Sequence, residues 1–107
     1  MREKREHQRA ILQVPVRVTP QGGSPWETTS VDISLGGMLL EGDAHVALGT
    51  EVTLSLTLPK LGQVDMPGFV RWASDRGFGV QFGLIGPRET HTIGGLVRSR
   101  PPQARPG

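Results

Sequence analysis

The run of alternating residues from Glu51 to Pro59, EVTLSLTLP, most constrains the fold of this chain. Its apolar side chains from Val52 to Leu58 alternate strictly with Thr and Ser. Because successive side chains of a strand point to opposite faces, this period of two predicts a strand that is buried on one face only. Strands of this kind are typical of antiparallel sheets, so the run favours a mainly β fold.

Shorter alternating segments surround this strand. In the first segment, residues 14–18, Pro15 marks an edge strand or the start of a strand. Between the last two segments, residues 64–73 and 78–82, the sequence SDRG at residues 74–77 predicts a tight hairpin connection. Turns rich in Gly, Pro, Ser and Asp separate the segments. The predicted strands are residues 14–18, 26–33, 38–41, 52–58, 64–73 and 78–82. So many short strands in one small chain predict a six-stranded antiparallel β-barrel.

The periodicity changes near the C-terminus. Ile93, Leu96 and Val97 follow the i, i+3, i+4 spacing of a helix, and Pro87 suits its first turn. The pair Gly94 and Gly95 costs a helix roughly 1 kcal/mol per residue. We therefore expect a short or frayed C-terminal helix.

The domain organisation follows from these patterns. Residues 1–10, MREKREHQRA, are polar and charged, and we expect a flexible basic arm there. Residues 11–98 form the barrel domain with its helix. Residues 99–107, SRPPQARPG, have a composition typical of a disordered tail.

Charge is distributed unevenly, although the formal net charge is only +2. Residues 1–9 hold four basic and two acidic side chains. Residues 10–87 hold four basic and seven acidic side chains, and residues 88–107 hold four basic side chains and one acidic side chain. The ends of the chain are therefore basic and its body is slightly acidic. This argues against a protein that binds DNA or RNA over its whole surface, and it allows a local anion site where one end folds back.

The composition also bears on the compartment. The chain has no Cys, which excludes a disulfide framework and thiolate metal sites. No apolar run approaches the roughly 20 residues that span a membrane, and no signal-peptide pattern follows the charged N-terminus. We expect a soluble, cytoplasmic protein without membrane insertion.

The candidates for catalysis are weak. His7, His45 and His91 lie in the arm, in a loop and near the tail, and no HExxH, GxSxG or phosphate-loop motif is present. Asp32 and Ser34 share a strand face, but the sequence ties no His to either. The chain is therefore not expected to be an enzyme, nor to need a metal or a cofactor.

The arm contains the spacing RxxxR, formed by Arg5 and Arg9 in REHQR. A helical turn would place both guanidinium groups on one side, whereas an extended arm would need a bend to bring them together. Two converging guanidinium groups suit a phosphate or the O6/N7 edge of guanine. The alternative is a solvated, charged terminus.

The segment SVDISLGGMLLE at residues 30–41 interrupts its strand pattern with Asp32, Ser34, Gly36 and Gly37. An ionised Asp accepts from paired N–H donors such as those of the guanine Watson–Crick edge, and Ser can donate or accept beside it. The glycines would let the backbone turn and would leave room for a flat ring. The alternative is a turn with local Asp and Ser hydrogen bonds.

Together, RxxxR followed by DxSxxG resembles the signature of PilZ domains, carried here by Arg5 and Arg9 and by Asp32, Ser34 and Gly37. The segments LGTEVTLSLTLP, GFVRWAS and GFGVQF also resemble the family's long strand and closing hairpin. The resemblance covers roughly residues 4–86. It implies a six-stranded barrel with a C-terminal helix that binds the bacterial messenger cyclic di-GMP.

By this resemblance, Arg5 and Arg9 would grip phosphate and guanine, while the DxSxxG residues would hold a guanine edge. Lys4 stands where many members carry a further Arg, a position associated with taking up a stacked ligand dimer. Because Lys is a point charge and not a planar fork, the ligand stoichiometry stays open. Trp72 matches an aromatic residue in the same hairpin of some members. Two alternatives stay open for Trp72: it contacts the ligand, or it packs in the core.

The resulting hypothesis is a non-enzymatic cyclic di-GMP receptor, active as a monomer or weak homodimer, that signals to an unidentified effector protein. Ligand binding would order the N-terminal arm and so create a surface for that effector. One alternative is a PilZ-like adaptor that binds no nucleotide. Another is a barrel that binds single-stranded nucleic acid, but such sites usually need a basic groove with several exposed aromatic residues.

Overall fold

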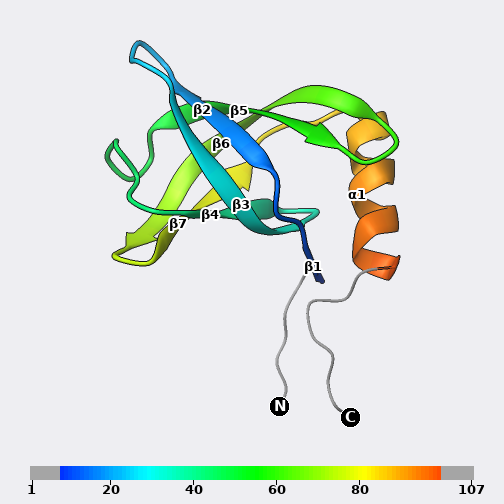
Figure 1. Ribbon diagram of the computed structural model, residues 1–107. Coiled ribbons are helices and arrows are strands. Elements are labelled where there is room, and N and C mark those ends of the chain that lie inside the picture. The colour runs from blue at the N-terminus through cyan, green and yellow to red at the C-terminus, as the bar shows by residue number, and fades with distance from the viewer. Residues whose placement is uncertain (1–7, 100–107) are drawn as a thin grey trace.

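A computed structural model describes residues 8–99 of the 107-residue chain. Lys4 and Arg5, and residues 100–107 of the predicted tail, lie outside the described residues, whereas Ser99 belongs to the helix. Within them the chain forms seven strands and one helix (Figure 1). These are β1 (Arg9–Ile11), β2 (Pro15–Pro20), β3 (Trp26–Ser34), β4 (Gly37–Glu41), β5 (Glu51–Leu58), β6 (Gly62–Ser74), β7 (Gly77–Phe82) and α1 (Pro87–Ser99).

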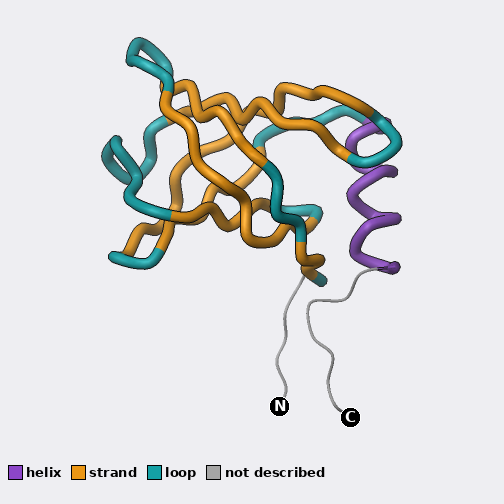
Figure 2. Tube along the Cα trace, in the orientation of Figure 1, coloured by secondary structure: helices purple, strands orange, loops and turns teal. Residues whose placement is uncertain are grey.

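Six of the strands close into an antiparallel barrel in the order β3-β2-β5-β6-β7-β4, and β4 pairs with β3 to complete the circle. Strand β1 is an addition that also pairs with β3. The curved strands enclose the core, and α1 stands beside one end of the barrel (Figure 2). The prediction of a six-stranded antiparallel barrel with a C-terminal helix is confirmed.

Strand β1 corrects the predicted boundary between arm and barrel. Arg9 and Ala10 were expected in the flexible arm, but both belong to β1, where Arg9 lies opposite Ser34 and Ala10 opposite Ile33 on β3. Ala10 is fully buried. A three-residue strand is too short to show an alternating pattern in the sequence, so only its pairing with β3 defines it.

The buried hydroxyl of Ser30 joins β1 to β2. The residues between β1 and β2 are not part of the regular pairing with β3. On the other side of β3, its register with β4 shifts between Ser30 and Asp32. Ser30 Oγ donates to the carbonyl of Leu12 and accepts from the amide of Val14 at 3.0 Å. Because buried backbone groups need partners, this side chain lets β1 and β2 follow each other along one edge of β3.

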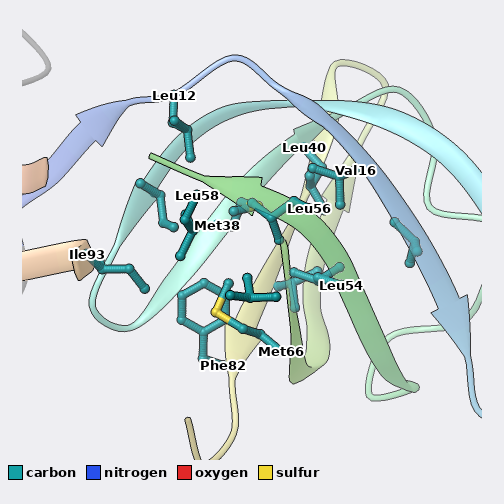
Figure 3. Packing of buried hydrophobic residues seen from close by; sticks show 14 of the residues in the cluster. Leu12, Val16, Met38, Leu40, Leu54, Leu56, Leu58, Met66, Phe82 and Ile93 are labelled. Atoms are coloured by element: carbon teal, nitrogen blue, oxygen red, sulfur yellow. The ribbon is translucent and has the colours of Figure 1, made fainter. Parts of the chain in front are cut away.

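The core is the inward face of the alternating strands. Leu54 and Leu58 are fully buried, and the Thr and Ser residues between them face outward or are half-buried. Leu54, Leu56 and Met66 project into the space between the strands (Figure 3). The period of two in the sequence therefore correctly predicted which face of β5 is buried.

Helix α1 is longer and more regular than expected. It runs without interruption through Gly94 and Gly95 for 13 residues. Ile93, Leu96 and Val97 are buried against the core, and α1 packs on β1 and β3 (Figure 3 shows Ile93). Burial of each such side chain contributes about 1.5–3 kcal/mol, which outweighs the roughly 1 kcal/mol cost of each glycine. The expectation of a short or frayed helix was wrong for this reason.

Candidate functional site

A cleft of ≈ 820 Å³ opens on the outer surface and is lined by residues of β1, β3, β4, β6 and β7. One side, here named the motif wall, consists of Arg9, Asp32, Ser34, Gly36 and Gly37. The other side, across the β4–β7 pairing, is named the hairpin wall and consists of Arg71, Trp72, Gly79 and Gln81. Met38, Leu39 and Val80 complete the lining. The cleft therefore brings together Arg9, the DxSxxG residues and Trp72, which are the described members of the predicted set of site residues.

The pairing of β1 with β3 positions the charged centre of the motif wall. Arg9 lies opposite Ser34, two residues from Asp32 on the same strand face. Arg9 Nε donates to Asp32 Oδ1 at 2.7 Å, and Arg9 Nη1 donates to Ser34 Oγ at 3.5 Å. The Arg9 and Asp32 side chains are 33% and 19% exposed, so the ion pair is partly shielded from water but remains open to a ligand.

The hydroxyl of Ser34 holds the turn between β3 and β4. Ser34 is 1% exposed, and its Oγ accepts from the backbone amides of Gly36 at 3.1 Å and Gly37 at 3.2 Å. This is the local hydrogen bonding that the sequence left open as an alternative for this segment. Ser34 therefore braces the turn while also lying on the cleft and contacting Arg9.

Gly37 is required by the barrel. A Cβ at this position would lie well inside contact distance of the Val80 carbonyl oxygen and 3.3 Å from the Cα of Gln81. Both neighbouring atoms belong to the backbone of β7, so they cannot move aside without opening the β4–β7 pairing. The structure thus explains the glycine at position 37 in another way than the expected room for a flat ring. The absence of a Cβ allows β4 and β7 to approach each other closely.

Trp72 points outward, into the cleft, and is 48% exposed. The sequence left a core position open because Trp72 has the phase of buried Val70, and that alternative is wrong. The β6–β7 register shifts between the two residues: Val70 pairs with Val80, but Trp72 pairs with Gly79. This β-bulge inserts one residue, which reverses the alternation and turns Trp72 to the outer face.

Two further features of the hairpin wall were missed at the sequence level. The indole of Trp72 lies over Gly79. A Cβ on residue 79 would be 2.6 Å from the Cε2 atom of Trp72, so the glycine makes room for the ring. Arg71 Nη1 donates to Gln81 Oε1 at 2.7 Å, and both side chains line the cleft. The sequence contains no signal for the bulge, because the alternation of residues 64–70 continues unbroken to Trp72.

The charges of the described lining residues leave the cleft slightly positive. Arg9 and Arg71 supply two guanidinium groups, and Asp32 supplies one carboxylate. Within residues 8–99 no cluster of three or more His, Cys, Asp or Glu side chains could hold a metal ion. No helix in the described part of the chain is long and apolar enough to cross a membrane.

The family model of the PilZ domain matches residues 3–99, which span both sequence motifs. A search of curated protein sequences gives no significant match.

Solved structures share the fold at low sequence identity. The PilZ domain of CeSA from a cellulose-synthesizing bacterium is 18% identical, with a TM-score of 0.68 over 85% of this chain and 95% of that one. The PilZ domain of YcgR from Escherichia coli, solved with c-di-GMP, is 13% identical, with a TM-score of 0.72 over 92% of both chains.

The MrkH–c-di-GMP complex from K. pneumonia is 15% identical, with a TM-score of 0.72. The match covers 92% of this chain but only 52% of MrkH, so this chain corresponds to about half of that protein. These likenesses confirm the fold that the residue pattern predicted.

Proposed function

Because this chain belongs to the PilZ domain family, a family of cyclic di-GMP receptors, we propose that it binds cyclic di-GMP in the cleft between the motif wall and the hairpin wall. The observation that carries this proposal is the placement of Arg9, Asp32 and Ser34 in one hydrogen-bonded group that lines the same cleft as a half-exposed Trp72. The structures of YcgR and MrkH solved with this ligand support the choice of ligand.

Asp32 is suited to read a guanine. Its Oδ1 already accepts from Arg9, but a carboxylate has about four acceptor positions, so Oδ2 and the second lone pair of Oδ1 remain. These can accept from the N1–H and the N2 amino group of a guanine edge. Adenine lacks this pair of donors, so Asp32 would discriminate between the two bases.

The base would also be held by its face. The Trp72 indole is half-exposed in the cleft and rests over Gly79, which leaves its outer face open. Stacking of a base on an aromatic side chain contributes about 1–3 kcal/mol and fixes the plane of the base. Trp72 would therefore orient a guanine, while Asp32 identifies one.

The phosphates of the ligand are negatively charged, so cationic side chains are expected to bind them. Arg9 presents a guanidinium group to the cleft, and the RxxxR motif adds Arg5, which lies outside the described residues together with Lys4. We propose that both cations of the motif bind the dinucleotide and that Lys4 adds a weaker, less directional contact. The number of bound dinucleotides follows from the same titration that measures affinity.

We further propose that the arm carries the signal. Contact of Arg5 with the ligand would fix the N-terminal residues against the cleft and form a surface for an effector protein, as in other order–disorder switches. No reaction step is needed, in keeping with PilZ domains as regulatory ligand-binding domains.

Isothermal titration of the full chain with cyclic di-GMP and cyclic di-AMP tests the proposal. We expect saturable binding of the guanine nucleotide and at least tenfold weaker binding of the adenine one, a difference of about 1.4 kcal/mol. Hydrogen exchange of residues 1–8 should slow when cyclic di-GMP is added. A folded chain that binds neither nucleotide would refute the proposal and favour a PilZ-like adaptor that binds only proteins.

A further inference from the structure

The hairpin wall holds a cation that neither sequence motif contains. Building on the proposed function, we propose that Arg71 forms an anion subsite in the same cleft as Arg9 and the DxSxxG residues, that this subsite takes a phosphate of the cyclic dinucleotide, and that Gln81 positions Arg71 for this contact.

The β-bulge creates the subsite. In a regular strand Arg71 and Trp72 would point to opposite faces, and one of them would enter the core. The register shift between Val70 and Trp72 places both side chains on the outer surface, and both line the cleft. An aromatic ring and a guanidinium group are thus neighbours on one wall, which matches a ligand in which each base is joined to a phosphate through one sugar.

The charge of Arg71 is not balanced by a nearby carboxylate. Its hydrogen-bond acceptor is the neutral amide oxygen of Gln81, at 2.7 Å. Among residues 8–99 the ion pairs within 4.0 Å are Arg9–Asp32 and Arg17–Glu27, so Arg71 takes part in none. Part of the Arg9 charge is offset by Asp32, whereas the full charge of Arg71 is available to an anion.

Gln81 directs this charge without cancelling it. Gln81 lies on the outer face of β7 and pairs with Gly37 on one side and Phe69 on the other, so its backbone is held by both neighbouring strands. The amide oxygen accepts from one Nη, and among residues 8–99 no other hydrogen bond engages the remaining guanidinium donors. Gln81 is therefore a positioning residue for Arg71.

Titration of the full chain and its Arg71→Gln variant with cyclic di-GMP, at low and high salt, tests the subsite. We expect the variant to bind about 10-fold to 100-fold more weakly, and its affinity to depend less on salt, because one charge-assisted contact is lost. Arg71→Lys should recover most of the affinity, since it restores the charge. Arg76→Gln in the β6–β7 turn, outside the cleft, is the matched control and should bind within about twofold of wild type.

The outcomes separate the two proposals. If wild type binds and Arg71→Gln behaves like Arg76→Gln, the anion subsite is overturned while the proposed function stands. If Arg71→Lys is as weak as Arg71→Gln, Arg71 acts through its planar group and the phosphate assignment is overturned. If the folded wild type binds no cyclic di-GMP, both proposals fail.

Gln81→Glu tests the positioning role. Glutamate keeps the length and the acceptor, but it neutralises Arg71 by pairing with it. Affinity should fall about as far as in Arg71→Gln, while the melting temperature stays unchanged or rises. Gln63→Glu on β6, which does not line this cleft, is the control for an added negative charge. Unchanged affinity in Gln81→Glu would show that Gln81 only supports the sheet.

Discussion

The two walls of the cleft are built by different means. On the motif wall, Arg9, Asp32 and Ser34 bond to one another and to the turn that follows, so these residues also hold the fold together. On the hairpin wall, Trp72 is half-exposed and Arg71 donates a hydrogen bond to the neutral amide of Gln81. We therefore expect substitutions in the motif wall to change both stability and the proposed binding, and substitutions of the exposed side chains of the hairpin wall to change mainly the proposed binding.

The glycines of the two walls repeat this difference. Gly37 permits a backbone-to-backbone approach of β4 and β7, which every folded molecule needs. Gly79 makes room for the ring of Trp72, a side chain that lies on the surface. A glycine in a binding motif is thus no evidence by itself that a ligand lies against it.

Gly37→Ala should have the largest effect. Its Cβ would overlap the Val80 carbonyl oxygen, and relief would require separating β4 from β7. We expect about 3 kcal/mol of destabilisation in urea unfolding, together with loss of cyclic di-GMP binding. The control is Gly95→Ala on α1, where a Cβ meets open space and should add roughly 0.5–1 kcal/mol of stability. Equal urea midpoints for wild type and Gly37→Ala would contradict this reading.

Arg9→Ala should mainly weaken binding. It removes the cation nearest Asp32 and leaves that carboxylate without its partner. We expect about 100-fold lower affinity for cyclic di-GMP, equivalent to about 2.7 kcal/mol, and a lower melting temperature. Arg17→Ala is the matched control, because its ion pair with Glu27 is exposed and lies outside the cleft. Similar affinities for the two variants would mean that Arg9 acts only in the fold.

Asp32→Asn should change the choice of base. The amide keeps one acceptor oxygen for Arg9 but turns an NH₂ group toward the donors of guanine. We expect the preference for cyclic di-GMP over cyclic di-AMP to fall by at least tenfold, measured by titrating both nucleotides. A variant that discriminates as well as wild type would leave Asp32 as a residue of the turn and of the ion pair alone.

Trp72→Ala should have the smallest effect of the four, and it tests the hairpin wall by itself. Loss of one stacking contact predicts about tenfold weaker binding. The urea midpoint should not change, because the ring is half-exposed. Phe69→Ala is the control, since Phe69 is an exposed aromatic residue on the same strand that does not line the cleft. A large loss of stability in Trp72→Ala would remove the distinction between the two walls.

Much of the motif wall could be predicted from local spacing. Asp32 and Ser34 are two residues apart, so a strand places them on one face whatever surrounds it. Their meeting with Arg9, 23 residues from Asp32, depends on β1, and the short β1 has no sequence pattern of its own. The family resemblance supplied that link, since the spacing alone left the arm free to be a solvated terminus.

The hairpin wall shows where local pattern misleads. Reading the alternation through Val70 to Trp72 predicts a core position, because a sequence does not show which residue a strand will bulge out. Register is set by the partner strand, and here Trp72 faces Gly79 and not a larger residue. Arg71 and Gln81 are ten residues apart, and only the hairpin pairing brings their side chains together.

The sequence by itself determined the barrel class and the buried faces of its strands, because side-chain direction along a strand depends only on the alternation of neighbouring residues. It also determined the residue types of the motif wall. The tertiary structure alone decided the strand at Arg9, the full length of α1 and the outward turn of Trp72. Each of these depends on contacts between distant segments, whose pairing energy and burial outweigh local preference.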